Sequence, residues 1–165
     1  MSESVLVELI RGRGAFTDAL ACVSGLDAAA AGQRAGAPYS VHELVFHMNY
    51  WMDYELRRLA GQSPAYPEHA AEGWPSSPAP ASDAEWRAVA TRFEALLERM
   101  IELARDDAPD RPVPITSRAS HANQGGTLRD VLWQTLVHNA YHLGQVTSVR
   151  RMLGAWPPPG GGDTW

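Results

Sequence analysis

The sequence contains no lysine and only one cysteine, and each shortage narrows what the protein can be. All 14 basic residues are arginine, which together with the many Ala, Gly and Pro residues indicates a GC-rich bacterial genome rather than a function. Because a single cysteine cannot form an internal disulfide, nothing indicates a secreted disulfide scaffold. Cys22 falls within the apolar pattern of an expected helix, so we predict a small core residue.

Long apolar runs and a basic charge balance are missing too. No segment approaches the ~20 apolar residues that cross a bilayer, and the acidic N-terminus does not resemble a signal peptide. We therefore expect a cytoplasmic protein that does not enter membranes. The net charge of −5 argues against a nucleic-acid partner, which normally needs a basic surface.

The 165 residues fit a single domain spanning 1–165, with a Pro- and Gly-rich tail at 157–165 that we expect to be extended. Four segments carry the apolar period of helices: residues 4–23, 40–59, 82–104 and 127–154. Gly12 and Gly14 predict a bend in the first segment. Capping-box patterns start the other three at Ser40, Ser82 and Thr127, and Gly154 ends the last.

Two connections of about twenty residues follow the second and third expected helices. Structureless loops of this length are uncommon unless they cross the fold or line a site. We therefore predict an all-α fold, an antiparallel four-helix bundle with a long crossover connection.

Histidines are the residues in this sequence most suited to chemistry. His138 and His142 lie four apart on the last expected helix, so both rings can meet one ion. His47 lies on the apolar face of the second expected helix, where a lone histidine is usually hydrogen-bonded in the core. Three such rings facing one another are costly to bury unless something binds their lone pairs. A divalent metal site at His47, His138 and His142 is the simplest interpretation; a half-buried polar seam is the alternative.

The other histidines do not fit this site. His42 lies ~140° around the helix from His47, and we expect it on the surface at the helix start. His69 and His121 lie in the two long connections and are expected to be solvated.

A three-histidine site leaves coordination positions open, as in catalytic rather than structural metal sites. In helical projection six side chains lie near it: Tyr50, Trp51, Tyr54, Gln134, Tyr141 and Gln145. Gln145 could orient a ligand or substrate, and Tyr50 and Tyr54 are the other weak catalytic candidates, although such residues are more often bundle packing. There is no H-E-x-x-H motif, no phosphate-binding glycine loop and no dinucleotide fingerprint.

Four stretches of the chain resemble the DinB/YfiT-like family of bacterial metalloproteins. They are residues 39–47 (Y-S-V-H-E-L-V-F-H), 68–75 (E-H-A-A-E-G-W-P), 138–145 (H-N-A-Y-H-L-G-Q) and 153–158 (L-G-A-W-P-P). The resemblance implies a four-helix bundle with a long crossover, usually a homodimer, with Zn, Ni or Fe held by three histidines. Those ligands correspond to His47, His138 and His142.

The resemblance also implies a thiol-dependent activity, because the family includes bacillithiol S-transferases and a mycothiol-dependent maleylpyruvate isomerase. The leading hypothesis is a metal-dependent enzyme that transfers a low-molecular-weight thiol to a small electrophilic substrate. Two alternatives stay open: a metal-dependent hydrolase that uses hydroxide at the ion, and a non-catalytic metal-binding stress-response protein. A metal-free bundle is the simplest remaining possibility.

Overall fold

The computed structural model describes residues 4–113 and 126–161. These residues form helices and no strands, so the predicted all-α class is confirmed. The elements in chain order are α1 (Val5–Ile10), α2 (Ala19–Val23), α3 (Ala28–Ala31), α4 (Val41–Leu59), the 3-10 helix η1 (Ala70–Gly73), α5 (Asp83–Ala104) and α6 (Leu128–Met152). Among the described helices, none is long and apolar enough to cross a membrane.

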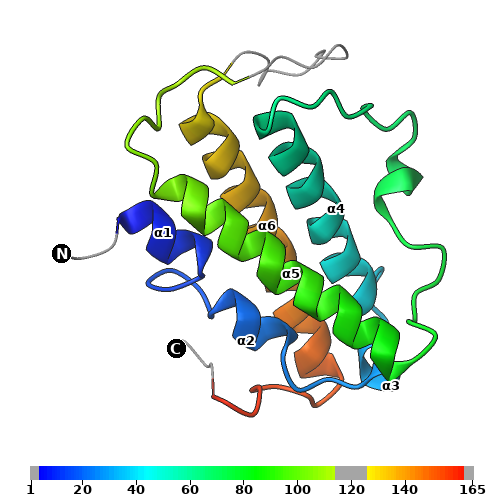
Figure 1. Cartoon of the computed structure of the whole chain (residues 1–165). Helices are drawn as coiled ribbons and strands as arrows, with labels where there is room; N and C mark the ends of the chain where they lie inside the picture. The colour runs from blue at the N-terminus through cyan, green and yellow to red at the C-terminus, as the bar shows by residue number, and fades with distance from the viewer. Residues whose placement is uncertain (1–3, 114–125, 162–165) are drawn as a thin grey trace.

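The three long helices lie side by side, with α4 packed against both α5 and α6 (Figure 1). The predicted antiparallel order is wrong for one pair, because α4 and α5 run in the same direction and only α6 runs against them. A hydrogen bond from Ser40 Oγ to Pro78 O, 2.6 Å long, holds the start of α4 close to the chain just before α5. The connection 60–82 therefore runs the length of the molecule, which is the long crossover that the loop length predicted.

The N-terminal segment is two short helices rather than one continuous helix with a bend. Gly12 and Gly14 both have positive φ, at 86° and 84°, which makes a turn between α1 and α2. A Cβ atom at Gly12 would collide with the carbonyl oxygen of Thr17. The two glycines predicted where the helix is interrupted, but the interruption is a turn between two helices and not a bend within one.

The predicted capping boxes are present in full at Ser40 and Thr127. At Ser82 only half of the box forms: the serine accepts from the Glu85 amide, while the Glu85 carboxylate accepts from the Ala81 amide instead. Gly154 takes the expected positive φ, 68°, beyond the end of α6.

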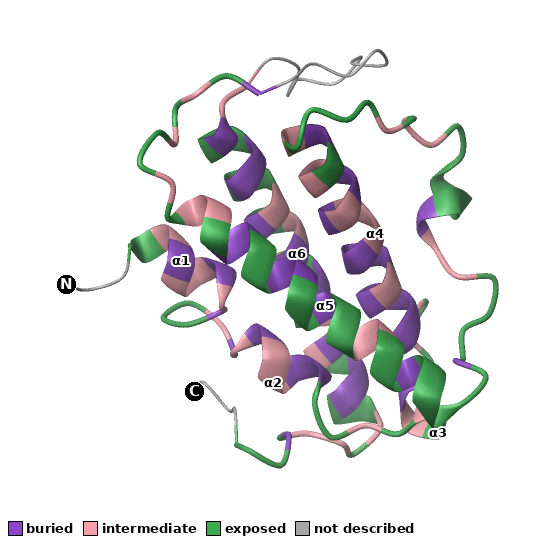
Figure 2. Ribbon diagram, in the orientation of Figure 1, coloured by how far each residue is buried: buried purple, intermediate pink, exposed green. Residues whose placement is uncertain are grey.

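The buried residues lie where α4, α5 and α6 face one another and where α1 and α2 cover them (Figure 2). Cys22 is buried, as predicted. His42 is not on the surface as expected, since only 2% of it is exposed. The crossover covers this part of α4, and backbone groups of Ser77 and Pro78 hydrogen-bond the ring.

A buried arginine holds the N-terminal segment against the last helix. Arg150 on α6 is 1% exposed, and its guanidinium donates to the carbonyls of Cys22 at 2.7 Å and Ser24 at 2.8 Å. It also donates to the carbonyl of Ala155 at 3.0 Å. The carbonyls at the end of α2 have no helical partner, so the arginine satisfies groups that would otherwise be buried without one.

Replacing Arg150 by Met should therefore lower the free energy of unfolding by about 3 kcal/mol, because several carbonyls lose a charged donor. Urea denaturation followed by circular dichroism measures this. Arg99→Met is the matched control, since Arg99 forms an exposed pair with Glu102 and should change little. Equal stability of the two variants would contradict the role given to Arg150.

Candidate metal centre

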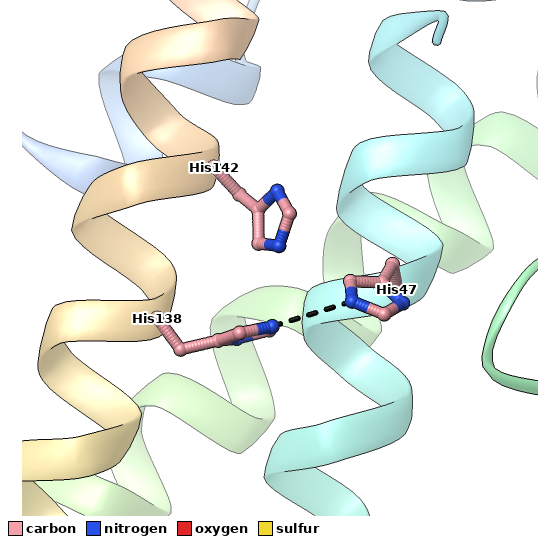
Figure 3. Close-up of side chains that lie close together, drawn as sticks. All are labelled: His47, His138 and His142. Atoms are coloured by element: carbon pink, nitrogen blue, oxygen red, sulfur yellow. Dashed lines mark hydrogen bonds between the residues drawn. The ribbon is translucent and has the colours of Figure 1, made fainter. Parts of the chain in front are cut away.

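The three predicted histidines meet between two helices that run in opposite directions. His47 comes from α4, and His138 and His142 come from successive turns of α6 (Figure 3). One ring nitrogen from each residue lies within 4.8 Å of the others, which makes a group that could hold a metal ion. His47 and His142 are buried and His138 is half-buried. The sequence spacing thus predicted a real convergence in space.

Two of the three rings donate a hydrogen bond from their second nitrogen, Nδ1, to a fixed oxygen atom. His47 Nδ1 lies 2.9 Å from the carbonyl oxygen of Gly73, and His142 Nδ1 lies 2.7 Å from Gln145 Oε1. Because both oxygens only accept, each Nδ1 must carry the proton. The lone pair of each ring is then on Nε2, and a hydrogen bond behind a ligating imidazole is what holds such a ring in metal sites.

The nearest two of the three nitrogens are spaced as in a metal site. His47 Nε2 and His138 Nε2 are 3.3 Å apart. Two imidazole nitrogens bound tetrahedrally to one zinc ion, each at about 2.0–2.1 Å, stand about 3.4 Å apart. The donor set is all imidazole nitrogen, which suits Zn, Ni and Fe alike.

Burial keeps the three imidazoles neutral, which is the form that binds metal. Loss of solvation, together with the neighbouring rings of His142 and His47, lowers the pKa of His138 to about 4. Burial also lowers the pKa of His47 and of His142, against the raising effect of the hydrogen bonds that the two rings donate to Gly73 and Gln145. The cluster therefore presents lone pairs rather than protons at neutral pH.

The crossover supplies two contacts to the site that the sequence pattern did not assign. Gly73, at the end of η1, gives the carbonyl that His47 needs, and a Cβ there would lie 3.3 Å from His47 Nδ1. The Trp74 ring stacks on His47 at 3.9 Å between centroids, and Tyr39 stacks on the other face of Trp74 at 4.2 Å. The only signal in the sequence was a Gly-Trp pair inside a stretch, 68–75, that resembles the family.

The remaining candidates divide into those near the rings and those apart from them. Gln145 contacts His142 directly, and Tyr141 packs its ring at 5.0 Å from that of His142. Trp51 lies edge-on to His47 at 6.4 Å. Gln134 is exposed on α6.

The two tyrosine candidates lie one and two turns along α4 from His47. Tyr50 is half-buried and packs near Gly73, and burial raises its pKa. Tyr54 is buried between Trp51 and Tyr66, and its hydroxyl has no hydrogen-bond partner among the described residues. Within the described part of the chain, neither tyrosine forms a hydrogen bond with any of the three histidines. His69 is exposed in the crossover, and His121 lies outside the described residues.

Comparison with known protein families identifies the group to which this site belongs. The profile of the mycothiol S-transferase family matches residues 13–154, which include all three histidines and both long connections. The chain belongs to this family. The mycothiol S-transferase family is part of the DinB/YfiT-like superfamily, so the resemblance seen in the sequence is confirmed. No curated protein and no solved structure gave a significant match.

Membership of the mycothiol S-transferase family links the three-histidine group to thiol transfer as a class of reaction. The family's name describes a transferase that handles a thiol, and the histidine group could hold the metal that such a reaction would use. The match ends at Gly154, so the tail from 155 onward lies outside it.

The lowered histidine pKa values predict how the metal-free protein responds to acid. Between the ordinary value of 6.5 and the value of about 4 for folded His138, the unfolded chain binds a proton that the folded chain does not. Stability should therefore fall as the pH drops through this window, by at most about 1.4 kcal/mol per pH unit for this one group.

Urea unfolding of the chelator-treated protein at several pH values between 7 and 5 measures that slope. His138→Gln should make it shallower, while His69→Gln, which changes an exposed histidine, should leave it as in the wild type. Identical slopes in all three proteins would contradict the burial of a neutral His138.

Proposed function

We propose that this chain is a metal-dependent S-transferase that joins a low-molecular-weight thiol, mycothiol being the first to test, to a small electrophilic substrate. The observation that carries the proposal is the convergence of three neutral imidazoles, two of them with the Nδ1 proton held by a fixed acceptor, in a chain of the mycothiol S-transferase family. The native metal would be Zn, Ni or Fe.

A divalent ion held by His47, His138 and His142 would favour the thiolate form of a thiol that reached one of its remaining positions. The net reaction forms one sulfur–carbon bond while the thiol proton leaves the sulfur. Either the electrophile releases a leaving group, or an electrophilic double bond takes up the proton.

The chain's own residues would supply orientation and shelter. The Gly73 carbonyl and Gln145 fix which nitrogen of His47 and His142 is free. Trp74 covers one face of His47 and keeps water from that side of the ring. Gln145 is in this account a positioning residue, acting through His142, and no catalytic role is assigned to Tyr50 or Tyr54.

Hydrolysis is the competing enzymatic function, because an ion with open positions also activates water. It differs in requiring no thiol. A non-catalytic metal-binding protein differs from both in showing neither activity. The family match favours the thiol reaction over these two alternatives.

The cellular setting is part of the proposal. We propose a bacterial, cytoplasmic protein whose partner is a small molecule, and a homodimer as its assembly. Trp133 and Val137 on α6, 41% and 63% exposed, are large apolar side chains of the kind that contacts between subunits cover. The mass in solution tests the homodimer.

The zinc-loaded chain should consume mycothiol in the presence of monochlorobimane, with the fluorescent thioether as the readout. His138→Ala should lower the rate by at least about 100-fold, since a metal ion supplies several kcal/mol of stabilisation. His69→Ala should retain the wild-type rate.

Two results would count against thiol transfer. One is turnover of p-nitrophenyl acetate that needs zinc but no thiol, which would favour the hydrolase. The other is the absence of thiol consumption together with thiol binding that is no tighter to the zinc-loaded than to the metal-free protein.

A further inference from the structure

A groove lies beside the metal centre, between the loop before α4 and the outer face of α6. Its volume is about 430 Å³, within the range of sites that hold small molecules. Residues 36–39 form one wall, and Tyr141, Gly144, Ser148 and Met152 of α6 form the other. Tyr141 and Met152 are 65% and 54% exposed, so an occupant would remove large apolar surface from water.

The lining is mostly apolar, with hydrogen-bond donors at one place. Gln145 Nε2 donates to the Tyr141 hydroxyl at 3.5 Å, which leaves the hydroxyl proton and the second amide proton of Gln145 for another acceptor. Both residues line the groove. This pattern suits a largely apolar molecule that carries a carbonyl oxygen at one edge.

Gly144 makes the room for such a molecule. It lies on α6 with ordinary helical φ, and a Cβ there would meet nothing within 4 Å. A glycine in the interior of a helix costs about 1 kcal/mol relative to alanine. A larger side chain at this position would fill the groove without a clash in the core.

Gln145 connects the groove to the metal centre. Its Oε1 accepts from His142 Nδ1, while its Nε2 is on the side of Tyr141 and the groove. Nδ1 and Nε2 are on opposite sides of the imidazole, so the groove lies behind His142 relative to the converging nitrogens. A molecule in the groove is therefore outside the reacting position and still touches the residue that fixes a ligand.

We propose that this groove is a binding site for small apolar carbonyl compounds, coupled to the metal centre through Gln145. In the metal-free protein a turn of the Gln145 amide would allow the His142 proton to move to Nε2. A metal ion on Nε2 excludes that state, so it holds Gln145 Oε1 toward the ring and the amide protons toward the groove. Metal and carbonyl ligand therefore strengthen each other's binding, and the coupling is reciprocal. The coupling rests on the metal site proposed above, whereas the groove itself does not.

The probe is 6-propionyl-2-(dimethylamino)naphthalene, a flat aryl ketone whose emission moves to the blue in apolar surroundings. It is titrated into the full chain, first free of metal. Gly144→Phe should weaken its binding by at least about tenfold, which corresponds to 1.4 kcal/mol. Gly144→Ala is the matched control, because it also removes the helical glycine but does not fill the groove, and should bind within about twofold of wild type.

The second measurement is the same titration with zinc present. Zinc should tighten probe binding to the wild type by about fivefold or more, and Gln145→Met should abolish this effect of zinc on the probe. Equal probe binding by the zinc-loaded and the metal-free wild type overturns the coupling. A chain that binds no zinc refutes the proposed metal site, and the Gly144 series still tests the groove.

Two outcomes overturn the binding site itself. One is equal probe binding by wild type and Gly144→Phe, or none by either. The other is a wild-type dimer that excludes the probe and that Gly144→Phe converts to a monomer by light scattering, since the groove would then be a contact between two copies of the chain.

Discussion

Three neutral imidazole rings that face one another inside a protein constrain the residues around them. Neutral rings 3.3 Å apart at their nearest nitrogens gain nothing from each other beyond one hydrogen bond, and burial opposes their protonation. The chain nevertheless commits the far side of two of the rings to Gly73 and Gln145. A cation among the three rings would give that arrangement a physical reason, because it would bind one lone pair of each ring at once.

The crossover between α4 and α5 connects the three histidines to the rest of the fold. It lets α5 run parallel to α4, and on its way it passes beside the site, where it supplies the Gly73 carbonyl and the Trp74 ring. Tyr39 from the loop before α4 completes the stack of rings. The same loop borders the groove on α6, so the loop before α4 connects the three histidines both to the crossover and to the groove.

Local patterns in the sequence predicted what local physics decides. Capping boxes placed the starts of the long helices, and the spacing of His138 and His142 placed both on one face of α6. What the sequence mispredicted or did not indicate depended on contacts distant in sequence. His42 becomes buried because residues near Pro78 return to cover it, and Arg150 is buried because α2 ends against it. No helical period reports that Gly73 and Trp74 lie over His47, since they sit in a loop whose path is set by the whole fold.

The central claim is that His47, His138 and His142 hold one metal ion, and elemental analysis of the untagged protein tests it most directly. The wild type is compared with a variant in which all three histidines are Ala, after both are reloaded with zinc and freed of excess. The account predicts about one ion per wild-type chain and none in the triple variant. No metal in the wild type, or equal metal in both proteins, would contradict it.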